Sequence, residues 1–270
     1  MCFFHKEVPM KIPKITLPSS FELRRPLYLI VPAAGLGTRM GISDSKQFFR
    51  INGVPVLART LLAFSEYQEK TGITIHAVIV TTEENISRVK ELVGEYKISF
   101  VEKIVKGGAT RQDSVACGIA ALADLDTPPQ DPDPVFIHDG ARCMVDQETI
   151  ASCYSGGHLY DVCVAATPCK NTIKMAVSSE DGKSGEKHPI VDKTLDRDTL
   201  YEVQTPQVFK YGVLVDVSKK AKVLGITATD DTALAEALGI DVHLIPCSYG
   251  NIKITTPEDA AIAEYMLSRK

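Results

Sequence analysis

Two cationic side chains follow a glycine turn near the start of the chain, and this combination is suited to holding a polyphosphate. The apolar run 29–31 leads into Gly35 and Gly37, and Arg39 and Lys46 follow shortly afterwards. Glycines let a backbone approach a ligand closely and point its N–H groups at phosphate oxygens. Cationic side chains neutralise the charge that N–H groups leave uncancelled. The segment therefore predicts a polyphosphate site.

The turn matches neither of two common nucleotide-binding loops. Met40 stands where the third glycine of the Rossmann pattern G-x-G-x-x-G belongs, and the P-loop pattern G-x-x-x-x-G-K-[ST] is absent. The small Ala33 and Ala34, directly after Pro32, would let a flat ring pack against the backbone. The alternative is a tight turn that carries two solvated cations.

A second glycine turn, Gly107-Gly108, leads into a segment with helical periodicity. The N-terminus of a helix attracts anions, and its free amides can bind the edge of a base. Ser114, in the first turn of this helix, could donate a hydrogen bond to a base carbonyl. An ordinary glycine-rich connection explains the same residues equally well, so both interpretations stay open.

The segment His138–Arg142 places a carboxylate and a guanidinium at the end of an apolar strand. Asp139 could bind Mg²⁺ or a ribose hydroxyl, and Arg142 could bind a substrate phosphate. The alternative is an Asp–Arg surface pair that contributes little. We interpret His138 as structural, and with six histidines and no H-x-x-x-H pattern a zinc site is unsupported.

Strand-like and helix-like segments alternate along the chain, which indicates an α/β sandwich around a mostly parallel sheet. Ligands of such sheets bind beyond the carboxyl ends of the strands. Gly35, Gly107 and Asp139 each follow a strand, so they should face one crevice. Strands are predicted at 27–32, 73–81, 98–105, 134–138 and 162–167, and helices at 56–65, 83–93, 111–123, 146–160, 211–223, 230–238 and 257–268.

Two segments need separate interpretation. Residues 168–197 are lysine-rich with a polar insert at 178–187, and they resemble an excursion from the core rather than another strand–helix unit. The helix at 230–238 begins with two aspartates, and we expect Thr229 to be its N-cap.

Composition limits the class of protein. The net charge of −4 over 270 residues argues against broad electrostatic binding to nucleic acid. The seven cysteines are odd in number and lack C-x-x-C spacing, which favours a reducing cytoplasm over a disulfide framework. Residues 1–26 lack a continuous apolar run, so we expect a poorly ordered extension rather than a signal peptide. We also expect no membrane span.

With all these segments in order, the chain from about Leu27 onward resembles the 2-C-methyl-D-erythritol 4-phosphate cytidylyltransferases of the non-mevalonate isoprenoid pathway. The motifs that carry the resemblance are PAAGLGTRM…KQ, GGATRQDSV, HDGAR, TLDR, QTPQ, TDDTALAE and NIKITTPED. The resemblance implies a Rossmann-like three-layer α/β/α nucleotidyltransferase fold, of the nucleotide-diphospho-sugar transferase type, with a protruding dimerisation arm. It also implies transfer of a cytidylyl group from CTP to a polyol phosphate, with release of diphosphate.

The matching positions imply a role for each motif residue. Arg39, Lys46 and Lys253 would be catalytic, and the first two would stabilise the α-phosphate as it reacts. Asp139 would also hold Mg²⁺ or another divalent cation. Residues implied around CTP are Pro32, Ala33, Ala34, Gly35, Gly37, Gly107, Gly108, Ser114 and Asp139. Residues implied around the acceptor are Arg142, Thr172 and Arg197.

The resemblance further implies a cytoplasmic homodimer. A single domain would cover residues 27–270, with a dimer arm at about 168–200 that crosses into the partner's site. Thr172 and Arg197 would then contact the acceptor bound by the other subunit. We expect neither nucleic acid nor membrane as a partner.

Some positions depart from the family pattern. Gly140 and Cys143 replace an alanine and a proline, and both changes are expected to loosen a turn next to the acceptor site. A ribitol-5-phosphate or other polyol-phosphate cytidylyltransferase is an alternative, although Ala33-Ala34 favours the methylerythritol enzymes because ribitol-type members tend toward glycine there. A non-catalytic nucleotide-sensing relative is a more distant alternative.

Overall fold

A seven-stranded sheet forms the centre of the computed structural model, which describes residues 25–35, 45–180 and 187–269. Its strands are β1 (Leu27–Pro32), β4 (Ile75–Thr81), β5 (Val101–Lys106), β6 (Pro134–Ile137), β7 (Val162–Pro168), β10 (Tyr201–Lys210) and β11 (His243–Pro246). They lie in the order β11-β7-β10-β6-β1-β4-β5. Only β10 runs antiparallel to its neighbours in this sheet, so the expected mostly parallel sheet is confirmed.

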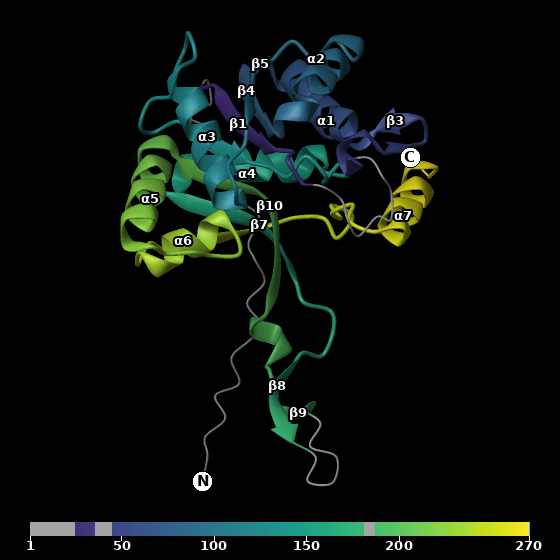
Figure 1. Cartoon of the computed structure of the whole chain (residues 1–270), viewed down its shortest axis with the longest axis vertical. Helices are drawn as coiled ribbons and strands as arrows, with labels where there is room; N and C mark the ends of the chain where they lie inside the picture. The colour runs from purple at the N-terminus through teal and green to yellow at the C-terminus, as the bar shows by residue number, and fades with distance from the viewer. Residues whose placement is uncertain (1–24, 36–44, 181–186, 270) are drawn as a thin grey trace.

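Helices cover both faces of the sheet, which confirms the three-layer fold (Figure 1). One face packs against α1 (Val56–Thr71), α2 (Ile86–Glu95) and α4 (Gln147–Leu159). The other packs against α3 (Arg111–Ala123), α5 (Tyr211–Leu224) and α6 (Asp231–Ala237). Strand β1 shows why both faces are buried: its alternate side chains enter the two different cores.

Smaller elements complete the body. The last helix, α7 (Pro257–Leu267), packs on a separate small cluster together with the short strand β2 (Arg50–Ile51), which pairs with β3 (Val54–Pro55). Two single-turn helices, η2 (Lys46–Phe48) and η3 (Glu83–Asn85), come just before β2 and α2, respectively.

The observed helix ends agree best with the ends predicted from the sequence where a capping residue defines the end. Helix α3 begins after Thr110, whose hydroxyl accepts the N–H of Asp113 in a capping box. The expectation for α6 is wrong by one residue, because Asp230 and not Thr229 is the N-cap: the Asp230 carboxylate accepts the N–H of Ala233. Helix α1 continues to Gly72, which ends it in the left-handed conformation that glycine favours.

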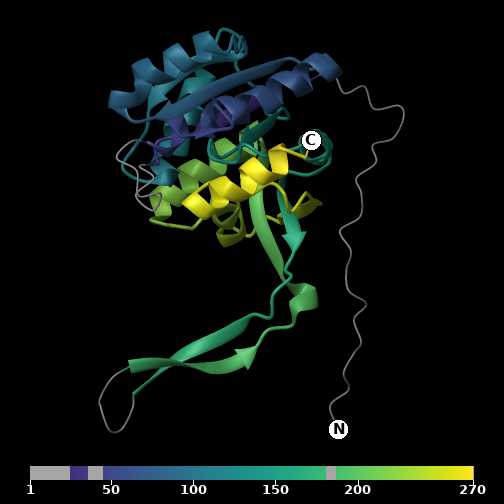
Figure 2. The same ribbon diagram turned by 90° about the vertical axis from the view of Figure 1, so that its right-hand side faces the viewer.

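The excursion between β7 and β10 is a hairpin that projects from the body (Figures 1 and 2). It consists of β8 (Lys174–Glu180) and β9 (Lys187–Thr194), and a single helical turn, η4 (Arg197–Thr199), returns the chain to β10. We call residues 169–200 the arm. Every residue of β9 is exposed, so no alternation of buried and exposed side chains marked this strand in the sequence.

The carboxyl ends of the parallel strands meet at one edge, and backbone bonds extend the sheet beyond them. The N–H of Ala33 donates to Val80, and the N–H of Gly107 donates to Thr81. On the other side of β1, the N–H of Gly140 donates to Pro32. These bonds bring the three turns predicted from the sequence to one edge.

Candidate active site

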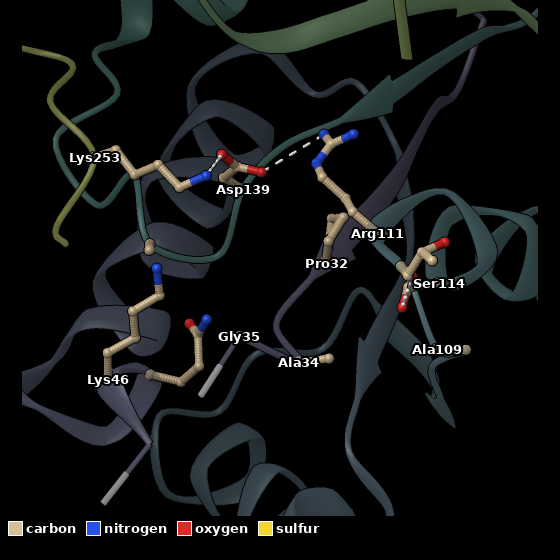
Figure 3. Close-up of a pocket in the computed structure, with 13 residues that line it drawn as sticks. Pro32, Ala34, Gly35, Lys46, Ala109, Arg111, Ser114, Asp139 and Lys253 are labelled. Carbon is tan, nitrogen blue, oxygen red and sulfur yellow. Dashed lines mark hydrogen bonds and ion pairs between the residues drawn. The ribbon is translucent and has the colours of Figure 1, made fainter. Parts of the chain in front are cut away.

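A cavity of about 260 Å³ lies at this edge (Figure 3). The turns after β1 and β6, the N-terminus of α3, the η2 turn and the segment before α7 all contribute to it. Its lining residues are Pro32, Ala34, Gly35, Lys46, Gln47, Gly108, Ala109, Thr110, Arg111, Ser114, Asp139, Ala141 and Lys253. Among these lining residues Asp139 is the one carboxylate.

Asp139 is buried among three cations. Its Oδ2 accepts a hydrogen bond from Lys253 Nζ at 2.7 Å, and its Oδ1 lies 3.7 Å from Nη2 of Arg111. Arg142 Nε is 3.8 Å from Oδ2. Burial alone would raise the pKa of this carboxyl, but the three cations outweigh it and lower the pKa to about 2. The carboxylate is therefore ionised at neutral pH.

A chain of hydrogen bonds fixes the turn that carries Asp139. The Asp139 N–H donates to Thr205 Oγ1 at 3.1 Å, and that hydroxyl lies 3.1 Å from Nδ1 of His138. His138 Nε2 lies 3.2 Å from the carbonyl of Arg142. Because a carbonyl only accepts, Nε2 carries the proton and Nδ1 accepts from Thr205. Burial lowers the pKa of His138 to about 4, so the ring is neutral and structural, as the sequence suggests.

The segment before α7 is bonded to the same turn. The Asn251 carbonyl accepts a hydrogen bond from Arg142 Nη1 at 2.8 Å, and its side-chain Nδ2 donates to the carbonyl of Thr205 at 2.8 Å. The N–H of Ile254 donates to Ala141. Lys253 lies between these anchored residues, which directs its side chain toward Asp139 (Figure 3).

The second glycine turn is built for close contact with α3. A Cβ atom on Gly107 would lie 2.7 Å from Ser114 Oγ, and one on Gly108 would lie 2.3 Å from Asp113 Cβ. Only glycine therefore fits at both positions. Ser114 Oγ donates to the Thr110 carbonyl at 2.9 Å, so its lone pairs are what it can offer a ligand in this arrangement.

Gly140 does not loosen its turn. Its N–H donates to Pro32, and its carbonyl accepts the hydroxyl of Thr60 at 2.9 Å. A Cβ atom at this position would lie 3.0 Å from Gln47 Oε1 and 3.1 Å from Leu57 Cδ1. The glycine thus sits in a tight space with both backbone groups bonded, which holds the turn in place.

The cavity brings together eight of the residues expected from the sequence: Pro32, Ala34, Gly35, Lys46, Gly108, Ser114, Asp139 and Lys253. Ala33 is buried behind the lining, where its N–H extends the pairing of β1 with β4. Gly107 and Arg142 do not line the cavity themselves: the Gly107 N–H donates to Thr81, and Arg142 donates to the carbonyl of Asn251. Gly37 and Arg39 fall outside the described residues, and Thr172 and Arg197 belong to the arm.

Sequence reasoning did not single out Arg111 and Gln47, which also line the cavity. A signal for Arg111 was available. It is the first residue of α3, where a positive charge opposes the helix dipole, so a cation there indicates a partner elsewhere in the fold. Gln47 directly follows Lys46 and offered no such signal.

The arrangement suits chemistry by charge and positioning. Cations and helix N–H groups face the cavity, and among the described lining residues there is neither a cysteine nor a histidine that could form a nucleophile–base pair. The described residues contain no group of three or more metal-ligating side chains. Mg²⁺ often uses one or two carboxylates together with substrate phosphates, so Asp139 fits as a single protein ligand.

Within the described part of the chain, no helix has the length and apolar character to cross a membrane.

Comparisons with known proteins agree on one family. The family model described as IspD, 2-C-methyl-D-erythritol 4-phosphate cytidylyltransferase, matches residues 27–269. The enzyme of that name from Dehalococcoides mccartyi is 42% identical over 89% of this chain and 95% of its own length. The one from Clostridium novyi is 39% identical over 88% and 95%. The crystal structure of the 4-diphosphocytidyl-2C-methyl-D-erythritol synthase from Anaerococcus prevotii superposes with a TM-score of 0.73 at 28% identity, over 91% and 99% of the two chains.

Proposed function

The chain belongs to the 2-C-methyl-D-erythritol 4-phosphate cytidylyltransferase family, and we propose that the cavity around Lys46, Asp139 and Lys253 is its active site. The protein is a nucleotidyltransferase that transfers a cytidylyl group from CTP to 2-C-methyl-D-erythritol 4-phosphate. The products are 4-diphosphocytidyl-2-C-methyl-D-erythritol and diphosphate. One observation carries the assignment of the site: two glycine turns and two lysines converge on the ionised carboxylate of Asp139.

CTP would lie with its base at the N-terminus of α3 and its triphosphate near Gly35 and Lys46. Gly108 and Ser114 line the cavity there, and the free N–H groups of the first helical turn are donors for a base carbonyl or a phosphate. Ala34 is small enough for the cytosine ring to pack against it. Arg39 and Lys46 would stabilise the α-phosphate and the leaving diphosphate.

The acceptor phosphate would lie on the side of Lys253 and Arg142. Lys253 Nζ is held by Asp139, so its charge is oriented before the substrate arrives. An acceptor phosphate oxygen would attack the α-phosphorus in line with the departing diphosphate. The chain then contributes position and positive charge rather than a covalent intermediate, which fits the side chains in the cavity.

Asp139 would also hold the divalent cation. A bound Mg²⁺ would neutralise part of the negative charge of the triphosphate, which would ease the departure of diphosphate. Both Asp139 oxygens already face cations, so the pairs with Lys253 and Arg111 would share the carboxylate with the metal.

The arm would complete the site of a second copy. Thr172 and Arg197 lie at the root of the arm and do not line the cavity of their own chain. The hairpin also exposes Met175, Val177, Ile190 and Val191. Exposed apolar side chains clustered on one element are typical of a contact surface. A homodimer with crossed arms would bury them and bring both polar residues to the partner's acceptor.

The reducing cytoplasm remains the proposed compartment. The six cysteines within the described residues are all free thiols, and three of them are buried in the body.

The test is turnover of CTP with 2-C-methyl-D-erythritol 4-phosphate and with ribitol 5-phosphate, each measured by diphosphate release in Mg²⁺. We expect rapid release with the methylerythritol substrate and much slower release with ribitol 5-phosphate. Preference for ribitol 5-phosphate would overturn the acceptor assignment. No release with either substrate would leave a nucleotide-sensing role.

A further inference from the structure

One buried carboxylate near the cavity has no part in the mechanism above. Asp231, the first residue of α6, is 3% exposed and bonds to Nη1 of Arg111. It does not line the cavity. A buried carboxylate is unfavourable unless a partner compensates for the lost hydration, and here burial raises the pKa of Asp231 even with Arg111 beside it. Such a residue calls for a role beyond packing.

Arg111 is shared unequally between two carboxylates. Its Nη1 is in direct contact with Asp231, whereas its Nη2 stays 3.7 Å from Oδ1 of Asp139. A guanidinium is a rigid planar fork, so the group that binds one branch determines where the other branch points. Asp231 therefore sets the distance between Arg111 and the carboxylate in the cavity.

Asp231 is itself firmly held. Its backbone N–H donates to Oε1 of the buried Gln207 at 3.1 Å, and its neighbour Asp230 caps α6. Helix α3 is tied to the same region, because Gln112 Nε2 donates to the carbonyl of Ile226 at 3.2 Å. The pair of Asp231 and Arg111 thus joins two elements that are fixed relative to each other.

We propose that Asp231 is a positioning residue for cytidylyl transfer, which acts by holding Arg111 back from Asp139. In this arrangement Oδ2 of Asp139 is left to Lys253, at 2.7 Å. Without the charge of Asp231, Arg111 would close on Asp139 and compete with Lys253 for the carboxylate. Lys253 would lose the contact that orients it toward the acceptor. The inference rests on the proposed function, because it assumes that Lys253 acts on the acceptor side.

The charge balance gives this role a distinct kinetic signature. Arg111, Arg142 and Lys253 exceed the two carboxylates by one positive charge, and Asp231→Asn leaves an excess of two. More positive charge beside the cavity does not weaken the binding of a polyanion. A misdirected Lys253, however, slows the transfer. We therefore expect kcat to fall about tenfold while the KM for CTP stays within about twofold of the wild type.

The experiment measures kcat and both KM values of the full chain with CTP and 2-C-methyl-D-erythritol 4-phosphate. An inactive wild type would refute the proposed function and, with it, any role of Asp231 in cytidylyl transfer. An active wild type with an equally active Asp231→Asn variant would refute the inference alone. A rise in both KM values together with a lower Tm would indicate a merely structural role and would also overturn it.

Asp133→Asn is the matched control. Asp133 is also 3% exposed and pairs with Arg25 at 2.8 Å, but it precedes β6 and so lies at the opposite edge of the sheet from the cavity. It should lower Tm, since a buried carboxylate loses its charged contact with the half-exposed Arg25, and leave kcat within about twofold of the wild type. A tenfold loss of kcat in this control would mean that any buried charge loss slows the enzyme, which would contradict the specific role of Asp231.

A double-mutant cycle tests whether Asp231 acts through Arg111. In an Arg111→Gln background, Asp231→Asn should change kcat by less than about twofold. A full tenfold loss in that background would overturn the proposal.

If Asp231→Asn does not fold, Arg111→Lys takes its place. Lysine keeps the charge but carries one ammonium on a flexible stem instead of a rigid fork, so Asp231 no longer fixes its distance from Asp139. The ammonium would then compete with Lys253 for that carboxylate, and kcat at saturating CTP should fall similarly. A wild-type kcat in this variant would contradict the proposal.

Discussion

In the cavity, Asp139 is buried among Lys253, Arg111 and Arg142, whereas on the arm every residue of β9 faces solvent. The charges of the cavity are held by partners from α3, the β6 turn and the segment before α7. On the hairpin, Lys174 bonds across the two strands, to Oγ1 of Thr194 at 2.6 Å. An isolated two-stranded hairpin is marginally stable in water. The body therefore holds its charged side chains in position by itself, whereas the arm needs a packing partner to hold its charged side chains in position.

The largest effect should come from a charge in the cavity. Lys46→Ala should lower kcat by about 10²–10³-fold and change CTP affinity little, because the charge of Lys46 is needed most as the α-phosphate reorganises. Steady-state kinetics and direct CTP binding would measure the two quantities. Lys210→Ala, which breaks an ion pair with Asp161 at the opposite edge of the sheet, should change neither. An unchanged kcat in Lys46→Ala would show that the charge of Lys46 in the cavity matters no more for the reaction than that of a cation elsewhere on the surface.

Acid should next weaken the cavity cluster. The pKa of Asp139 is lowered to about 2, so the ionised carboxylate stabilises the fold above about pH 4, and this contribution disappears as the pH falls through about 2. The expected loss is about 2 kcal/mol. Urea unfolding of the wild type and of Asp139→Asn would measure it, since the stability difference between them should shrink toward low pH. A difference that is independent of pH would show that the cations do not stabilise the charged form.

A charge on the arm should matter for one substrate only. Arg197→Ala should raise the KM for the acceptor about tenfold and leave the KM for CTP unchanged, because Arg197 would contact the acceptor and not CTP. Lys193→Ala removes an exposed cation from β9 and serves as the control. Equal increases in both KM values would mean that Arg197 supports the whole site rather than the acceptor.

The smallest effect on the stability of the body should come from the hairpin surface. Val177→Ser and Ile190→Ser change exposed, paired positions of β8 and β9, so the unfolding free energy of the separated monomer should change by less than about 0.5 kcal/mol. The same variants should weaken dimerisation, measured by analytical ultracentrifugation over a range of concentrations. A dimer of unaltered strength would show that these side chains lie outside the contact between copies.

The two regions also differ in how far the sequence predicts them. The body was predictable because its strands are continuous apolar runs covered on both faces, and because local residues such as Thr110 and Asp113 define where α3 begins. The hairpin was not, since its strands are exposed on both sides and lack the alternation that marks a half-buried strand. The sequence indicated an excursion there and nothing finer.

The candidate site divides in the same way. Gly35, Lys46 and Asp139 follow strands that end at one edge, so local order along the chain was enough to bring them together. The pair of Arg111 and Asp231 joins residues 120 positions apart, and no local pattern predicts which carboxylate a guanidinium will meet. The roles of Gly37 and Arg39 remain predictions from the family motif.

The measurement that tests the central claim most directly is complementation between two impaired variants, assayed with the acceptor well below its KM. Lys46→Ala disables the cavity of its own chain, and under these conditions Arg197→Ala removes most of the activity that depends on the arm. If the arm completes the site of the second copy, half of randomly mixed dimers are heterodimers with one intact site, so activity should return to about one quarter of the wild-type value. Activity that stays at the average of the two separate variants would contradict the crossed arm. It would mean that Arg197 acts in the active site of its own chain.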